Sequence, residues 1–599
     1  MINALLVYPK NPKTFWSYDK ALEIAGKKSV FPPTGLMTIA ASMPSRYSLR
    51  LIDENIEPLK DSDIEWSDVI IASAMGIHKK SLEKIIKRAN EHERPVFAGG
   101  PLPTQHHDKI LGNATFFLGE AEAGFVEELD NVVREGYVPE RNIVDKRKIF
   151  VTLDNTPMQR FDLIKDNLNR YQSMAIQLTR GCPEHCTFCN IPSLYGNHTR
   201  IKDEKQFFGE LDALYGLGWR GSIMIVDDNV AGNQAALIPI LKKTAAWQKA
   251  HNYCFNFFTQ ASLRIFDNTE LLEAMYQAGF SQVFFGLESP SPESLKFMGA
   301  QKNIHDAGSG LSMMEKVCHI GENYFKPQAG FIMGFDADPK DIDQLMIGFI
   351  RDSRISVAMV GLLGILPDTS DYKRYDMQDR LVKDITYSGD SGMFSRQLSF
   401  IPQDSEGNRI SPEIVTDRLK NVLTNINSPK EYFFRTKEYI MNRKRRPLSS
   451  IPIKPSTLMA AARSIYHQGI KSSYRSTYWK YLFDIAMHDM KDIPDAISYA
   501  VEGHHVITIT KEKLKVDDVN TSIEAILSEL GKFEPKTFNI SDISKEYFKN
   551  MNRRFHALIR KYGRVKKDFK GEIKGLELLK ERYRKFAQSF DKKSYGYAQ

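Results

Sequence analysis

A chain of 599 residues, 42% hydrophobic and 26% charged, has the composition of a globular protein and is long enough for roughly three or four domains. No apolar run is long enough for a membrane-spanning helix, no signal peptide is evident, and five clustered cysteines do not make a disulfide framework, so a cytoplasmic protein is expected. The net charge of +8 is concentrated in residues 541–599, which hold 17 Lys/Arg and 7 Asp/Glu.

The first 135 residues alternate short apolar runs with helix-like patterns, which predicts a Rossmann-like, doubly wound parallel sheet. The candidate strands are 4–9, 49–55, 68–75, 95–101 and 115–122. Ligands of such sheets bind at the carboxyl ends of the strands. Small or turn-forming residues gather at these ends, namely Ser73, Ala74, Gly99, Gly100, Pro101, Gly119 and Glu120. A tight turn with no ligand is the alternative interpretation of the Gly-Gly-Pro run.

Residues 136–172 read as an irregular linker, and a second βα series follows over 173–400. Its candidate strands are 173–179, 222–228, 254–260, 282–288, 327–335 and 357–365. Six βα repeats without antiparallel hairpins predict a partial (β/α)6 barrel of the TIM type. We therefore expect the chemistry at the loops that follow the strands.

Three cysteines follow the first barrel strand with the spacing C-x3-C-x2-C: Cys182, Cys186 and Cys189. Soft thiolates at this density select an iron–sulfur cluster or zinc. His185 or His198 is a candidate fourth zinc ligand, and buried structural thiols are a third interpretation. Cys254 and Cys318 lie in apolar runs and are interpreted as core residues.

This motif, on a loop after the first strand of a βα barrel, resembles the radical S-adenosylmethionine (SAM) superfamily. The resemblance implies a 4Fe-4S cluster held by Cys182, Cys186 and Cys189, with one iron open to the methionine moiety of SAM. It also implies an external electron donor of the flavodoxin or ferredoxin type. The SAM-binding residues that it implies are Phe188, Asp227, Asp228, Thr259, Gln260, Glu288, Ser289 and Ile332. For any single polar residue among these, a helix N-cap is the alternative.

The stretches "FPPTGL", "VFAGGPLPT", "FLGEAE" and "GFIMGFDAD" resemble the cobalamin-binding branch that includes hopanoid methylases. The resemblance implies cobalamin on residues 1–135, contacted by Tyr8, Ser73, Ala74, Gly99, Gly100, Pro101, Gly119 and Glu120. It implies methylation of an unactivated carbon through a 5′-deoxyadenosyl radical. The first loop lacks Asp-x-His-x-x-Gly, so no lower axial histidine is expected, and His78 is interpreted as a surface or supporting residue.

Beyond residue 400 helix-like patterns dominate, so residues 401–599 are expected to form a mainly helical domain with a basic tail. Residues 504–514 are the best remaining strand candidate. The tail is interpreted as a solvated helical face, with a peripheral membrane contact as the alternative; nucleic acid binding is not expected. Asp368 stands where the branch has glycine, so the substrate, a small molecule or a lipid, is not assigned to hopanoids.

Three functions remain open. The first is a cobalamin-dependent radical SAM methyltransferase. The second is the same architecture doing non-methylating radical chemistry, such as oxidative cyclisation or rearrangement. The third is a zinc- or cluster-stabilised protein that binds nucleic acid.

Overall fold

The computed structural model describes residues 1–154, 156–304, 311–382, 398–444, 455–531 and 545–594. The chain forms two compact units, Met1–His505 and Val506–Gln599. The boundary falls inside helix α20 (Ile493–Gly531), so residues 401–505 pack with the first unit instead of joining a separate C-terminal domain. Within the described ranges, no helix is both long and apolar enough to cross a membrane.

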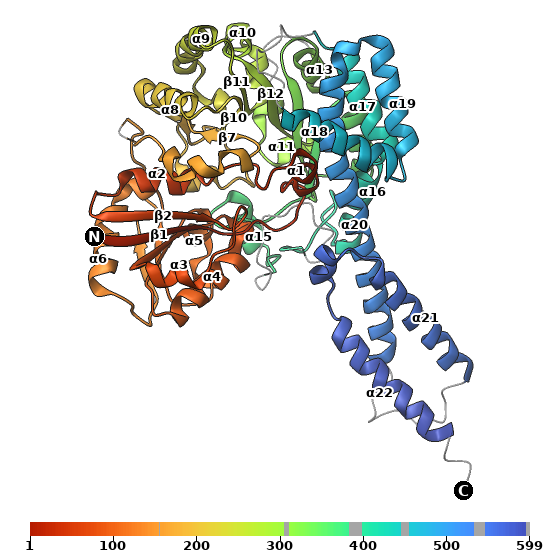
Figure 1. The fold of residues 1–599 in the computed structure, drawn as a ribbon. Helices are drawn as coiled ribbons and strands as arrows, with labels where there is room; N and C mark the ends of the chain where they lie inside the picture. Colours follow the sequence, from red (N-terminus) through yellow and green to blue (C-terminus); the bar gives the residue numbers. More distant parts are fainter. Residues whose placement is uncertain (155, 305–310, 383–397, 445–454, 532–544, 595–599) are drawn as a thin grey trace. The chain divides into compact units, whose positions relative to one another are not determined.

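The first sheet contains the five predicted strands of the front segment and one strand more. Its members are β1 (Ile2–Tyr8), β2 (Tyr47–Asp53), β3 (Val69–Ser73), β4 (Val96–Gly99), β5 (Thr115–Leu118) and β6 (Asn142–Asp145). They pair in parallel in the order β2-β1-β3-β4-β5-β6 (Figure 1). This is a doubly wound order whose direction of winding changes between β1 and β3. Strand β6 lies in the expected linker and shows no apolar run, because it is a solvent-exposed edge strand.

Helices cover both faces of this sheet, as near-continuous apolar strands require. On one face the packing helices are α3 (Asp61–Trp66), α4 (Lys79–Glu91) and α5 (Pro101–His106). On the other face they are α2 (Thr34–Ser42) and α6 (Phe125–Glu135). Helix α4 buries Leu82, Ile85, Ile86 and Ala89, a helical spacing that places one apolar stripe on the sheet.

All six predicted strands of the second series form, and they build an open, parallel sheet. They are β7 (Met174–Ile176), β10 (Gly221–Ile225), β11 (Phe255–Ala261), β12 (Phe280–Glu288), β13 (Lys326–Met333) and β14 (Val357–Leu362), paired in the order β14-β13-β12-β11-β10-β7. Helices α8 (Glu204–Gly216), α9 (Gln234–Ala250), α10 (Thr269–Ala278), α13 (Met313–Asn323) and α14 (Ile342–Asp352) connect them (Figure 1). The predicted partial (β/α)6 barrel is confirmed.

One feature of the barrel differs from the prediction. Strands β8 (Thr179–Arg180) and β9 (Arg200–Ile201) form an antiparallel pair that brackets the cysteine segment. Two-residue strands leave no periodicity in the sequence, so hydrophobic patterning could not reveal them.

After β14, the described residues of the first unit form the helices α15 (Ser370–Met377), α16 (Pro412–Ile426), α17 (Pro429–Asn442), α18 (Pro455–Ser464), η7 (Ile465–Ile470), α19 (Arg475–His488) and η8 (Met490–Asp492), with isolated bridges that join Leu381 to Phe400 and Gln403 to Arg409. The strand predicted at 504–514 is wrong, because these residues belong to α20. The run of β-branched residues also has helical spacing, and Val506, Ile509, Thr510 and Lys513 are all buried.

The basic tail forms helices α21 (Lys545–Gly563) and α22 (Leu576–Ser594) in the second unit. The two helices join through the stacked rings of Phe555 and Tyr583, whose centroids lie 3.8 Å apart. Arg554 and Lys561 form ion pairs with acidic residues of α20. Part of the tail's positive charge is therefore balanced within the unit.

Candidate active site

The three cysteines lie on the loop between β8 and α7 (Ile191–Tyr195), beyond the carboxyl end of β7. All three are free thiols; Cys186 is buried and the other two are partly buried. Gly181, at φ +90°, begins the loop. A Cβ on this residue would collide with the His198 carbonyl oxygen. The Thr187 amide donates to the Met298 carbonyl at 2.9 Å, which ties the loop to the segment after β12.

Burial keeps these thiols protonated in the absence of a metal. It raises the pKa of Cys186 to about 12 and that of Cys189 to about 11, and it also raises the pKa of Cys182. The charges of the three sulfurs act on one another, and the side-chain amide of Asn229 donates to Cys182 Sγ at 3.7 Å. Metal binding replaces the protons and supplies the missing positive charge.

The donor set fits a cluster held by three thiolates. His185 and His198, the candidate fourth ligands of a zinc ion, are both exposed. Among the described residues, no three His, Cys, Asp or Glu side chains group as they would around a single metal ion. Three cysteines on one loop supply the soft thiolate ligands that an iron–sulfur cluster takes.

The two aspartates after β10 have different environments. Asp227 is fully buried and accepts hydrogen bonds from the Leu178 and Thr179 amides and from the Thr179 hydroxyl at 2.8–2.9 Å. Burial raises its pKa to about 7. Asp228 is partly exposed and accepts one bond, from the Gly181 amide at 2.9 Å. Asp227 therefore holds the end of β7, whereas Asp228 keeps one carboxylate oxygen without a partner among the described residues.

The other candidate SAM-binding residues also fall into a buried group and a group with exposed side-chain surface. Thr259 is buried and donates to the Ile225 carbonyl at 3.0 Å, and Ser289 is buried and accepts from the Ser291 amide at 3.2 Å. Gln260 is exposed, and Ile332 and Phe188 are partly exposed. Only the second group leaves side-chain surface for a ligand.

Glu288, at φ +65°, ends β12 and forms an ion pair with Lys302, Nζ to Oε1 2.8 Å. Burial lowers the pKa of Lys302, but Glu288 and the nearby Cys186 and Cys182 outweigh it, so the pKa lies above its usual range. The Lys302 charge in turn favours the thiolate form of all three cysteines. Lys302 carries no signal in the sequence, because it lies in a polar segment outside any strand end or motif.

The inner surface of the barrel strands receives aromatic side chains from the front segment. Along β11 and β12 the outward residues are buried, while Phe258 and Phe284 on the opposite face are only partly buried. Phe31 lies 5.9 Å from Phe258, and Trp16 lies 5.6 Å from Phe284, measured between ring centroids. The segment between β1 and α2 therefore reaches the inner surface of the barrel strands.

At the carboxyl edge of the first sheet, the glycines have different roles. Gly100, at φ +95°, would place a Cβ 2.9 Å from Ser73 Oγ and 3.0 Å from the Ala74 oxygen. Gly119, at φ +108°, would place one 2.9 Å from the Lys146 backbone. At Gly99 the nearest atom would be 3.6 Å away, an ordinary contact. Close contacts with neighbouring protein atoms thus require glycine at positions 100 and 119, while Gly99 has room for a Cβ.

Glu120, predicted to contact cobalamin, is buried in an ion-pair cluster instead. Its carboxylate accepts from Arg200 and lies 3.3 Å from the Arg180 guanidinium. Glu122 also pairs with Arg180, at 2.9 Å. Arg180 precedes the cysteine loop directly, so this cluster joins the edge of the first sheet to that loop.

Tyr8 and His78 form an edge-to-face pair with centroids 5.1 Å apart. His78 is fully buried, so its interpretation as a surface residue is wrong; a supporting role fits. Its Nε2 donates to Asn11 Oδ1 at 2.6 Å and its Nδ1 accepts from the Met75 amide at 3.1 Å. Burial lowers the pKa of His78 to about 4. Both ring nitrogens are occupied, so the ring holds the first loop against the loop after β3.

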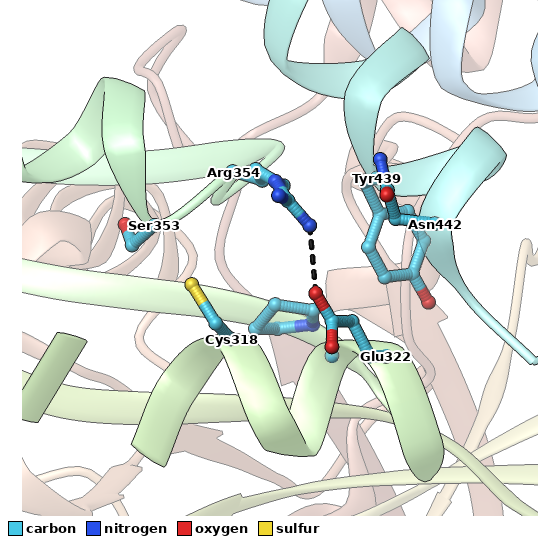
Figure 2. A pocket seen from close by; sticks show the side chains of 8 residues that line it. Cys318, Glu322, Ser353, Arg354, Tyr439 and Asn442 are labelled. Carbon is cyan, nitrogen blue, oxygen red and sulfur yellow. Dashed lines mark hydrogen bonds and ion pairs between the residues drawn. The ribbon is translucent and has the colours of Figure 1, made fainter. Parts of the chain in front are cut away.

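A separate small pocket lies at the other end of the barrel strands. Figure 2 shows Cys318 of α13, Tyr439 and Asn442 of α17, and the ion pair of Arg354 with Glu322, 2.8 Å between Nη1 and Oε1. Cys318 is partly exposed here, unlike the buried Cys254, so only Cys254 is the core residue expected. Barrels of this kind keep their chemistry at the opposite end.

Comparisons with known proteins agree with this arrangement. The Radical SAM superfamily matches residues 176–320, and a domain of unknown function, DUF4070, matches residues 369–517. The chain is 32% identical over 514 residues to the uncharacterized methyltransferase sll1242 of Synechocystis, covering 84% of this chain and 91% of that protein. It is 28% identical over 514 residues to the hopanoid C-2 methylase of Rhodopseudomonas palustris, covering 85% and 93%.

Among solved structures, the cobalamin-dependent SAM radical enzyme OxsB with aqua-cobalamin and SAM bound has the same fold, with a TM-score of 0.54. The identity is 13%, and the alignment covers 93% of this chain and 84% of that chain. The predicted family and fold class are confirmed: this chain is a radical SAM protein and belongs to the family of the Synechocystis methyltransferase.

Proposed function

We propose that this protein is a cobalamin-dependent radical SAM methyltransferase that methylates an unactivated carbon. The observation that carries the proposal is the three-thiol loop at the carboxyl edge of the barrel, joined through Arg180 to Glu120 at the edge of the doubly wound sheet. In this proposal the cluster site and the cobalamin site lie on either side of this ion pair. When bound, the cluster and SAM supply the 5′-deoxyadenosyl radical, and cobalamin supplies the methyl group.

Cys182, Cys186 and Cys189 hold the 4Fe-4S cluster in this proposal. Asp228 accepts from the SAM ammonium group, because a carboxylate with a spare oxygen forms a strong, charge-assisted bond there. Gln260, Ile332 and Phe188 supply the remaining side-chain surface. Asp227, Thr259, Glu288 and Ser289 position the strand ends and make no direct contact.

The carboxyl ends of β1, β3, β4 and β5 would hold cobalamin. Its contacts are Tyr8, Ser73, Ala74, Gly99, Gly100, Pro101 and Gly119. Glu120 acts through the two arginines that it binds, as a positioning residue. His78 supplies no lower axial ligand, because both of its ring nitrogens are used inside the protein.

The substrate is a small molecule or lipid that enters beside Trp16 and Phe31, where aromatic surface can exclude water from the reacting groups. A flavodoxin- or ferredoxin-type donor supplies electrons. The relative from Rhodopseudomonas is named for a hopanoid, an apolar lipid, which fits a substrate drawn from a membrane. The basic segment 541–599 would then contact an anionic membrane surface.

The test is anaerobic reconstitution of the wild type and of the Cys182→Ala variant. The wild type should bind about one cluster and one cobalamin, and should cleave SAM to 5′-deoxyadenosine. The variant should lose the cluster and SAM cleavage but retain cobalamin. Comparison of metabolites in cells with each form should show a product heavier by one CH2. Retained 5′-deoxyadenosine formation by Cys182→Ala would refute the assignment.

A further inference from the structure

Helix α19 presents an apolar stripe to solvent. Its inward face buries Tyr478, Tyr481, Leu482 and Ile485. Its outward face carries Trp479, Phe483 and Met487, four residues apart, with exposed fractions of 47%, 65% and 72%. This spacing places all three on one side of the helix. Figure 1 shows α19 at the outer edge of its helical group.

The stripe continues onto the neighbouring turns. Met490 of η8 is 68% exposed, and Ile470 and Tyr466 of η7 are 57% and 46% exposed. The Trp479 indole donates to the Gly469 carbonyl at 3.0 Å, which holds η7 against the start of α19. We name these six residues the α19 patch: Tyr466, Ile470, Trp479, Phe483, Met487 and Met490. Soluble monomers rarely expose so many large apolar side chains next to one another, so the patch marks an interaction surface.

The charges around the patch favour an anionic partner. Lys471, Arg475, Lys480 and Lys491 are exposed and form no ion pair among the described residues. Of the nearby acidic side chains, Asp489 accepts from the Lys491 amide at 2.9 Å, and three others form ion pairs. Asp484 pairs with Lys437 at 3.0 Å, and Arg443 pairs with Asp492 at 3.0 Å and with Asp495. Around the patch, four exposed basic side chains therefore form no ion pair among the described residues, while Asp484, Asp492 and Asp495 are paired.

We infer that the α19 patch docks this protein on an anionic lipid bilayer. Phe483, Met487 and Ile470 enter the boundary between head groups and acyl chains, and the Trp479 ring lies at the head-group level, where indoles concentrate. Lys471, Arg475 and Lys480 extend their apolar stems along the patch and place their charges at the lipid phosphates. The inference is independent of the cofactor chemistry, and it gives a route for an apolar substrate.

The test is flotation of the full-length protein with phosphatidylcholine vesicles made with and without phosphatidylserine. We expect binding that requires phosphatidylserine and weakens as salt rises. The variant Phe483→Ser/Met487→Ser should lose at least about tenfold in partitioning, because two large apolar side chains no longer leave water. Lys480→Glu should weaken binding less, and only to vesicles containing phosphatidylserine. All three positions are exposed, so both variants should unfold at the temperature of the wild type.

Two matched controls lie elsewhere on the first unit. Leu345→Ser removes a 43%-exposed leucine from α14, and Lys249→Glu reverses an exposed charge on α9; both should bind like the wild type. Equal binding by Phe483→Ser/Met487→Ser and the wild type would overturn the inference. So would the absence of vesicle binding together with a dimer that this variant abolishes, because the patch would then join two copies of the chain.

Discussion

Removing the charge of Lys302 and removing the charge of Glu288 should shift the reduction potential of the cluster in opposite directions. Reduction adds one negative charge to a cluster at the cysteine loop. The Lys302 ammonium stabilises that charge and the Glu288 carboxylate opposes it. Lys302→Gln should therefore lower the midpoint potential of the cluster, and Glu288→Gln should raise it. The double variant should lie near the wild type, because the two charges are removed together.

The size of the shift follows from burial. The two side chains are 13% and 9% exposed, so solvent screens them little. At an effective dielectric constant of about 20, a unit charge contributes about 4 kcal/mol at 4 Å and about 2 kcal/mol at twice that distance. An energy of about 2 kcal/mol corresponds to roughly 90 mV in a one-electron couple. We expect shifts of roughly 50–100 mV in each single variant.

The assay is a redox titration of the reconstituted protein, without SAM, followed by the electron paramagnetic resonance signal of the reduced cluster. Lys302→Arg keeps the charge and is the matched control, with an expected shift of less than about 20 mV. Iron content and cobalamin content should stay unchanged in all variants. Shifts of the same sign in both single variants, with the cluster intact, would refute the electrostatic argument. An absence of any cluster in the wild type would refute the proposed function instead.

Five further variants separate positioning residues from contact residues. Glu120→Gln should cost about 3–5 kcal/mol of stability, because it leaves the charges of Arg180 and Arg200 without their buried carboxylate partner. Metal and cofactor assays should show a lower content of both the iron–sulfur cluster and cobalamin. Loss of cobalamin alone would show that Glu120 contacts the cofactor. Asp228→Asn should weaken SAM binding about tenfold or more and leave the melting temperature unchanged. Asp227→Ala should lower the melting temperature, because it leaves three hydrogen-bond donors unpaired. The reverse pattern in calorimetry would exchange the two roles. Gly100→Ala should lose about 1–3 kcal/mol of stability as well as cobalamin, whereas Gly99→Ala should keep its stability and lose cobalamin only, by thermal unfolding and absorbance. Equal losses of stability in the two variants would contradict the packing argument.

The strands of both sheets could be predicted because they are continuous apolar runs, which can be recognised in the sequence without knowledge of the fold. It failed at 504–514, where β-branched residues also satisfy a helical spacing, and at β6, whose exposed residues carry no apolar signal. The cysteine spacing marked the cluster loop because three thiols so close together have few other uses.

Single polar residues at strand ends were harder to assign, because the sequence places them at an edge without saying where their side chains point. Asp227 and Asp228 are adjacent, yet one is tied to three donors and the other to one. Glu120 lies at the expected sheet edge, but its partners come from residues 180 and 200. Contacts between such distant parts of the chain arise only when both sheets have formed.

The amino-acid sequence by itself thus determined the two βα series, the three-cysteine loop and the membership of the radical SAM superfamily, since these depend on local patterns. The tertiary structure alone decided that Lys302 lies beside the thiols, that Glu120 binds two arginines, and that Trp479, Phe483 and Met487 remain uncovered. Each of these depends on which distant side chains meet when the chain packs. Local hydrophobic patterning does not reveal which side chains from distant parts of the chain come into contact.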